Sequence, residues 1–216
     1  MSTPRVSAPD RVLLLGVGNL LWADEGFGVR CIESFESSFD EHDAVDLVDG
    51  GTQGLYLVDL FRAYRRVIIF DAIDFGDLPG EIRIVEDDEI PAFVAGRKVS
   101  LHQAGLQDVI ACAKMLGGCA EKMVLIGVQP AELEDYGGSL TPTVRARLGD
   151  AVAHAAGQLA DWGVALLPRR DPRAGEAITP GLDIRNYERG RPSEKVACRV
   201  GDGRVLNQRA WRQDDR

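Results

Sequence analysis

The chain has 216 residues, a length that fits one α/β domain with an appendage, and its 45% hydrophobic content is enough for a full core without disulfides or a cofactor. Its net charge of −9 is uneven, because residues 1–167 hold 13 Lys and Arg against 26 Asp and Glu, whereas residues 168–216 hold 12 against 8. The acidic body argues against a nucleic-acid partner, and the absence of a long apolar run argues against a membrane span.

The amino terminus contains no apolar stretch of the kind found in a secretory signal, so we expect a cytoplasmic protein with a flexible segment at residues 1–10. The four cysteines, Cys31, Cys112, Cys119 and Cys198, are far apart and form no CxxC pair. They therefore predict free thiols rather than a zinc site or a disulfide framework.

Short apolar runs alternate with amphipathic stretches along the first three quarters of the chain. Continuous apolar runs predict buried strands at 11–17, 44–48, 67–72 and 123–128, with an edge strand at 81–85. Apolar residues at helical spacing predict helices at 26–39, 55–63 and 107–116. Because strands alternate with helices, we predict a three-layer α/β/α fold with a twisted, mostly parallel central sheet of about five strands.

The last predicted helix has the clearest boundaries. Thr141 can cap its amino end, Pro142 suits the first helical position, and Gly163 suits the stop. This helix completes a predicted domain of residues 11–167. Residues 168–216 are rich in Arg, Pro and Gly and poor in periodic apolar residues, so we predict an irregular, largely disordered basic tail.

Polar residues follow the predicted strands, where the binding crevice of such a sheet lies. Glu25, Asp71 and His102 come from three of these segments, and two carboxylates with one imidazole can bind a divalent metal while leaving positions open for substrate or water. Each residue also has an ordinary alternative role. Glu25, with its neighbour Asp24, can complement a helix dipole, Asp71 can bind backbone groups of a nearby loop, and His102 can cap the following helix.

Other motifs are weaker. The GVG sequence at 16–18, followed by the acidic Asp49 at the end of the second strand, is similar to a dinucleotide fingerprint, but Leu21 stands where the third glycine belongs. His42 lies in an acidic loop and His154 in the last helix, where solvated or core roles are usual. A nucleotide-binding protein is therefore the weaker interpretation.

From residue 12 to about residue 164 the sequence resembles the nickel-iron hydrogenase maturation endopeptidases of the HyaD and HupD type. The matching blocks, in chain order, are GVGNLLWADEGFGVR, DGGTQGLYLVDL, DAIDFGDLPGEI, DDEIPAF, SLHQAGLQDVI, LIGVQP and ELEDYGGSLTPTV. The resemblance implies an enzyme that removes a C-terminal extension from its partner, the precursor of the hydrogenase large subunit, after nickel has been installed.

By this resemblance the metal ligands are Glu25, Asp71 and His102, and Asp49 is a further functional acid. The precursor would carry the nickel, so the free enzyme need not hold a metal tightly, and other divalent ions can occupy the site. Asp49 and Asp71 are the candidate catalytic residues, with Asp49 as the group that accepts the proton of the attacking water. The family is also classed with aspartic peptidases, but no pair of DTG motifs is present. A non-catalytic, metal-sensing assembly chaperone stays open as the alternative.

Overall fold

The computed structural model describes residues 10–91, 101–170 and 184–190, and for residues 101–105 it describes the backbone alone. Its centre is a five-stranded sheet in the order β2-β1-β3-β5-β4. The strands are β1 (Val12–Val17), β2 (Val45–Gly51), β3 (Arg66–Ala72), β4 (Ile82–Glu86) and β5 (Lys122–Val128). The edge strand β4 is antiparallel to β5 and the other pairs are parallel. The predicted mostly parallel sheet is confirmed.

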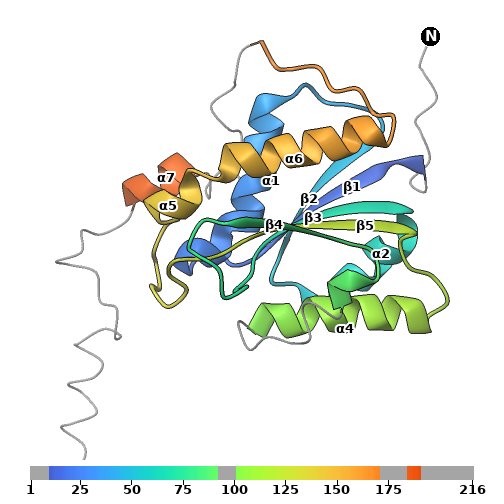
Figure 1. Cartoon of the computed structure of the whole chain (residues 1–216), viewed down its shortest axis with the longest axis horizontal. Helices are drawn as coiled ribbons and strands as arrows, with labels where there is room; N and C mark the ends of the chain where they lie inside the picture. Colours follow the sequence, from blue (N-terminus) through green and yellow to red (C-terminus); the bar gives the residue numbers. More distant parts are fainter. Residues whose placement is uncertain (1–9, 92–100, 171–183, 191–216) are drawn as a thin grey trace, which may run out of the picture.

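Helices cover both faces of the sheet and give the predicted three layers (Figure 1). One face carries α1 (Phe27–Ser38) and α6 (Leu148–Asp161), and the other carries α2 (Val58–Ala63) and α4 (Leu101–Met115). None of the helices in the described residues combines the length and the apolar content needed to cross a membrane.

Successive residues of the central strands contribute to two separate cores. Leu13 and Leu15 of β1 belong to the core that includes Phe61 and Ile110, on the side of α2 and α4. Leu14, between them, belongs to the core on the side of α1 and α6. Because side chains alternate along a strand, the position of a residue in this alternation shows which helical layer it faces.

The last predicted helix is interrupted. A one-turn helix, α5 (Pro142–Arg145), begins after Thr141, whose hydroxyl accepts a hydrogen bond from the Val144 N–H. The Arg147 N–H then bonds to the carbonyl of Val144, three residues back, which tightens the turn before α6 begins. Gly163, with a φ of 82°, lies just beyond the end of α6, as predicted.

Two boundaries differ from the prediction. Helix α4 begins at Leu101, so His102 lies inside a helix and not in the segment before it. Within the predicted tail, Pro168 forms a β-bridge with Phe39, and a further helix, α7 (Ile184–Gly190), contacts the body of the protein. Residues 184–190 of the predicted tail are therefore helical. The rest of the predicted tail after residue 170 and the predicted flexible residues 1–9 lie outside the described residues.

Candidate metal and catalytic site

Glu25 lies in a single 3-10 turn, η2 (Ala23–Gly26), which connects β1 to α1 at the carboxyl edge of the sheet. The turn begins at Ala23 with a φ of 37°, in the left-handed region that residues other than glycine rarely adopt. Backbone strain of this kind persists only where the surrounding structure enforces it. The neighbouring residue Asp24 supplies that enforcement.

Asp24 is fully buried and fixes the turn that carries Glu25. Its Oδ1 accepts a hydrogen bond of 2.7 Å from the Thr141 N–H, and its Oδ2 accepts bonds from the Thr141 hydroxyl and from the N–H groups of Ala131 and Glu132. A carboxylate with several charge-assisted hydrogen bonds is a strong anchor. The sequence interpretation missed this role because it assigned Asp24 only to a helix dipole.

Asp71 is the second-last residue of β3 and is only 3% exposed. Its Oδ1 accepts a hydrogen bond of 2.8 Å from the Ala72 N–H, whereas its Oδ2 has no hydrogen-bond partner among the described residues. Burial first, and then the negative charge of Glu25, raise the pKa of Asp71 well above its usual value. The turn η2 packs against β3, so the structure places Glu25 and Asp71 near each other. An unsatisfied oxygen beside a second carboxylate fits a divalent cation.

His102 lies in the first turn of α4, and its side chain lies outside the described residues. Helix α4 ends at Met115, shortly before β5 begins at Lys122, so its first turn is at the carboxyl edge of the sheet (Figure 1). Asp71 lies on the same face of β3 as the residues that pack against α2 and α4. Among the described side chains no group of three metal-binding residues occurs, but that set omits His102. The three-ligand site therefore stays a prediction.

Asp49 lies near the end of β2 and is half-buried. Its Oδ1 accepts a hydrogen bond of 2.9 Å from the Gly51 N–H. Burial raises the pKa of Asp49, and the Gly51 hydrogen bond and the charge of Arg30 partly offset that rise. Asp49 is opposite Gly16 of β1, which is opposite Phe70 of β3, so about 10 Å of sheet separates the backbones of β2 and β3.

Asp49 and Asp71 face opposite layers of the protein. Val45 and Leu47 of β2 pack against the core on the α1 side, and Asp49 continues that alternation towards Arg30 of α1. Asp71 faces the side of α2 and α4. A substrate that reaches both candidate catalytic acids would therefore have to lie above the carboxyl edge of the sheet.

Two further polar residues at this edge were missed by the sequence interpretation. Arg30 is only 3% exposed, and its Nη1 donates to both carboxylate oxygens of Glu33 at 2.8 Å. Gln129 is buried, and its Oε1 accepts from the Phe75 N–H at 2.6 Å, which fixes the loop after β3. Both are polar residues next to continuous apolar runs, GFGV and VLIGV, and that position is the signal that could have identified them.

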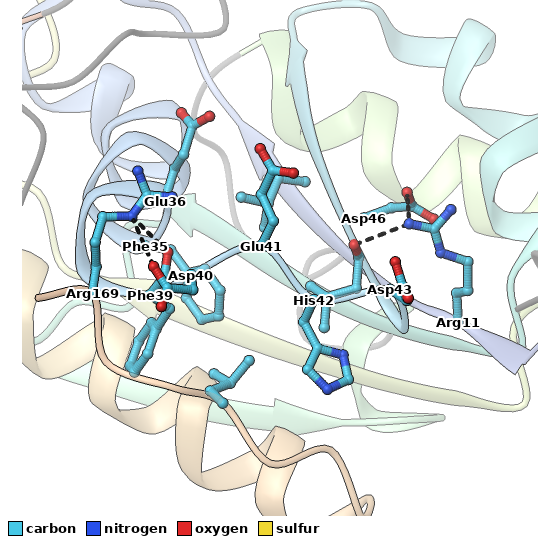
Figure 2. A pocket seen from close by; sticks show the side chains of 13 residues that line it. Arg11, Phe35, Glu36, Phe39, Asp40, Glu41, His42, Asp43, Asp46 and Arg169 are labelled. Atoms are coloured by element: carbon cyan, nitrogen blue, oxygen red, sulfur yellow. Dashed lines mark hydrogen bonds and ion pairs between the residues drawn. The ribbon is translucent and has the colours of Figure 1, made fainter. Parts of the chain in front are cut away.

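A cavity of about 360 Å³ lies at the opposite, amino edge of the sheet (Figure 2). Acidic side chains line it, together with Arg11, which forms an ion pair of 2.6 Å with Asp46. His42 also lines it, and its Nδ1 accepts a hydrogen bond from the Ala44 N–H. The cavity and His42 are therefore separate from Glu25 and Asp71.

Comparison with known proteins identifies the chain. The chain is 50% identical over 198 residues to the hydrogenase expression/formation protein HupD of Rhodobacter capsulatus, covering 92% of this chain and 94% of that protein. It is 48% identical over 210 residues to HupM of Azotobacter chroococcum, covering 97% and 99%. The solved structure of the hydrogenase maturating endopeptidase HybD from E. coli matches with a TM-score of 0.70 and 39% identity, over 74% of this chain and 98% of that one. A family model described as hydrogenase maturation protease matches residues 29–158, and the chain belongs to that family.

Proposed function

We propose that this protease removes the C-terminal extension from the precursor of a nickel-iron hydrogenase large subunit once that precursor carries nickel. One observation carries the proposal. The Asp71 carboxylate is buried beside Glu25, with an oxygen that has no hydrogen-bond partner among the described residues. Without a cation, such a pair lowers the stability of the folded protein, and a bound cation raises it. Cleavage can therefore depend on metal loading.

In this proposal the nickel arrives with the substrate. Glu25, Asp71 and the imidazole of His102 contact it and leave the remaining positions to groups of the precursor. The ion supplies Lewis acidity at the scissile carbonyl. Asp49, on the other side of the strand ends, accepts the proton of the attacking water. Its pKa, raised by burial, favours that role because a stronger base accepts a proton more readily.

A protein substrate also needs a docking surface, and exposed apolar side chains surround the candidate site. They lie in the loops that follow the parallel strands, at Leu21 after β1, Leu55 and Tyr56 after β2, Leu78 after β3 and Tyr136 after β5. Two of these loops contain the segments FGDLPGEI and LEDYGGSL. Large exposed apolar side chains grouped around a site are typical of surfaces that bind a protein. They support a folded precursor as the partner.

We place this reaction in the cytoplasm. Cys31, Cys112 and Cys119 are free thiols in the structure. Free thiols are the state that a reducing compartment maintains. This choice can be checked by fractionating cells and locating the protein with an antibody.

The decisive experiment mixes the purified protein with two forms of the large-subunit precursor, one loaded with nickel and one free of nickel. Intact-protein mass spectrometry then measures the products. We expect a mass loss that corresponds to a C-terminal peptide, only with the nickel-loaded form. The His102→Ala variant should give no product, whereas His154→Ala, at an exposed position on α6, should cleave like the wild type.

The same measurement separates the protease from an assembly chaperone. Stable binding of the precursor with no change in its mass would support the chaperone and contradict the proposal. Equal cleavage of both precursor forms would contradict the dependence on nickel.

A further inference from the structure

Helix α7 belongs to the tail that follows the family domain, yet it lies at the same edge of the sheet as Glu25 and Asp49. It contacts the loop before α5 at two points. The Tyr187 hydroxyl donates to the carbonyl of Gly138 at 3.3 Å, and the Ser139 hydroxyl donates to Glu188 at 2.8 Å. Arg145 of α5 forms an ion pair with the same Glu188 carboxylate. Helix α7 is thus attached to this loop by both a hydroxyl and a carboxylate.

The loop that α7 contacts is the one that holds η2. Its Gly137 N–H donates to the Leu21 carbonyl at 2.7 Å, and its Tyr136 ring contacts the Trp22 ring edge-on with 5.2 Å between centroids. Thr141, at the end of the loop, donates to Asp24 through its N–H and its hydroxyl. These contacts surround the strained turn from both sides, so movement of the loop would move Glu25.

Gly138 shows how close the loop and the turn are. A Cβ placed on Gly138 would lie 3.0 Å from the Cβ of Ala23, the residue with the left-handed backbone, and 2.7 Å from the Asp135 carbonyl oxygen. The carbonyl of this same glycine accepts the Tyr187 hydroxyl. A single residue therefore separates α7 from η2.

Helix α7 also contacts Arg30, whose charge acts on Asp49. The guanidinium of Arg30 lies 5.6 Å from the centroid of the Tyr187 ring, a cation–π geometry. Arg30 is buried in α1 and its charge acts on both Asp49 and Glu188. Tyr187 thus touches the residue beside Asp49 and, through Gly138, the loop beside Glu25.

We propose that α7 is a brace for the catalytic edge, in which Tyr187 and Glu188 act as positioning residues that fix η2 through the loop at 135–141 and fix Arg30 beside Asp49. The HupD and HupM relatives match more than nine tenths of this chain, whereas HybD is matched almost completely by 74% of it. A brace from the tail is thus an addition to a protease fold that is complete without it. Its loss should slow the reaction without abolishing it.

This inference rests on the proposed function for its kinetic test, and its structural test is independent of it. The variants are Tyr187→Leu, which removes both the ring over Arg30 and the hydroxyl group that bonds to Gly138, and Tyr187→Phe, which removes only the hydroxyl group. The control is Arg189→Gln, at an exposed position on the same helix. Hydrogen–deuterium exchange with mass spectrometry follows the peptides at 20–26 and 131–141, and cleavage of nickel-loaded precursor gives kcat and KM.

We expect Tyr187→Leu to speed exchange in both peptides and to lower kcat about tenfold with KM within about twofold, the size of effect that loss of one partly buried cation–π contact gives. Tyr187→Phe should restore most of kcat, and Arg189→Gln should match the wild type in both measurements. Unchanged exchange in Tyr187→Leu would overturn the brace. So would a raised KM with unchanged kcat, because α7 would then be a contact for the substrate alone. If the wild type itself cleaved nothing, the proposed function would fail and the exchange data alone would decide on the brace.

Discussion

The carboxylate of Glu25, in a turn after β1, lies close enough to that of Asp71, at the end of β3, to act on the ionisation of Asp71. Burial and then the charge of Glu25 raise the pKa of Asp71. Without a bound cation, the buried Asp71 beside the half-buried Glu25 lowers the stability of the folded chain, because like charges repel and the Asp71 carboxylate loses its hydration. The same arrangement is favourable when a divalent ion is present.

The first prediction follows from this repulsion. Asp71→Asn should raise the free energy of unfolding in the absence of metal by about 1–2 kcal/mol, since it removes a buried charge while keeping the side-chain volume. It should also abolish precursor cleavage. Urea denaturation of metal-free protein at pH 7 measures the first effect. The matched control is Asp150→Asn, whose side chain is 56% exposed, and which should change stability by less than about 0.5 kcal/mol. A less stable Asp71→Asn variant would contradict the repulsion.

The second prediction concerns Asp49. Asp49→Asn should keep the hydrogen bond from the Gly51 N–H, so the turn after β2 should stay intact. An amide cannot accept the proton of water at neutral pH, and the variant should bind the precursor normally while kcat falls by about 100-fold or more. Surface plasmon resonance gives the affinity and the mass assay gives the rate. Full turnover would exclude the proton-transfer role and would leave Asp49 as a partner of Arg30.

The sheet was predictable because its strands are continuous apolar runs. VLLLGV and VIIFDA are covered on both faces, so nearly every residue is apolar and the pattern is visible without tertiary information. Asp71 stands out for the same reason, as the only charged residue of the run VIIFDA. Glu25 was found through its motif, whereas its neighbour Asp24 was not, because hydrogen bonds from Thr141 and Ala131 are long-range contacts that no local pattern records.

Helix α7 shows the limit of the same reasoning. Its sequence, IRNYERG, has no apolar periodicity, so nothing local predicts that it packs on the domain. Its contacts are instead specific polar ones, from Tyr187 to Gly138 and from Ser139 to Glu188. The break between α5 and α6 was missed for a related reason. It depends on the Arg147 N–H bonding to the carbonyl three residues back instead of four.

The third prediction tests Asp24 as the anchor of η2. Asp24→Asn would place an amide nitrogen against groups that are themselves donors, the N–H of Thr141 or the N–H groups of Ala131 and Glu132. Leaving buried donors unsatisfied costs about 1–3 kcal/mol each, so we expect a loss of about 2–4 kcal/mol in unfolding free energy. Chemical denaturation measures this loss in unfolding free energy. A neutral effect would mean that the loop at 131–141 is held by its other contacts.

The fourth prediction concerns the packing of α1 on the strand ends. A Cβ on Gly28 would lie 2.2 Å from the carbonyl oxygens of Phe70 and Val17, and neither backbone can move without shifting a central strand. Gly28→Ala should therefore lower stability by about 3 kcal/mol or more, or prevent folding. Gly157→Ala is the matched control, because no atom lies within 4 Å of its Cβ position in α6, and it should gain about 0.5–1 kcal/mol. Thermal unfolding followed by circular dichroism compares the two, and equal melting temperatures would show that the strand ends accommodate the methyl group.

The fifth prediction is a pH dependence far from the candidate site, at the turn after β4. Partial burial works to raise the pKa of Asp87, but its ion pair of 2.8 Å with Lys122 and the hydrogen bond from the Met123 N–H outweigh it, and the pKa is lowered below the ordinary 3.8. A carboxylate with a lowered folded-state pKa contributes stability above its unfolded pKa and loses that contribution as the pH falls through the folded value. Asp87→Asn keeps the side-chain shape and suits the positive φ of 46° at this position. It should cost about 1 kcal/mol at pH 7.

The size of that cost should itself depend on pH. Urea denaturation of the wild type and of Asp87→Asn should give a constant difference from pH 7 to about pH 5 and a shrinking one below about pH 4, since the wild-type carboxylate then takes up its proton. Asp88→Asn is the neighbouring control, with a side chain that is 94% exposed, and should show little difference at any pH. If the difference for Asp87→Asn instead grew as the pH fell, the carboxylate would be destabilising the fold, and the ion pair with Lys122 would not explain the lowered pKa.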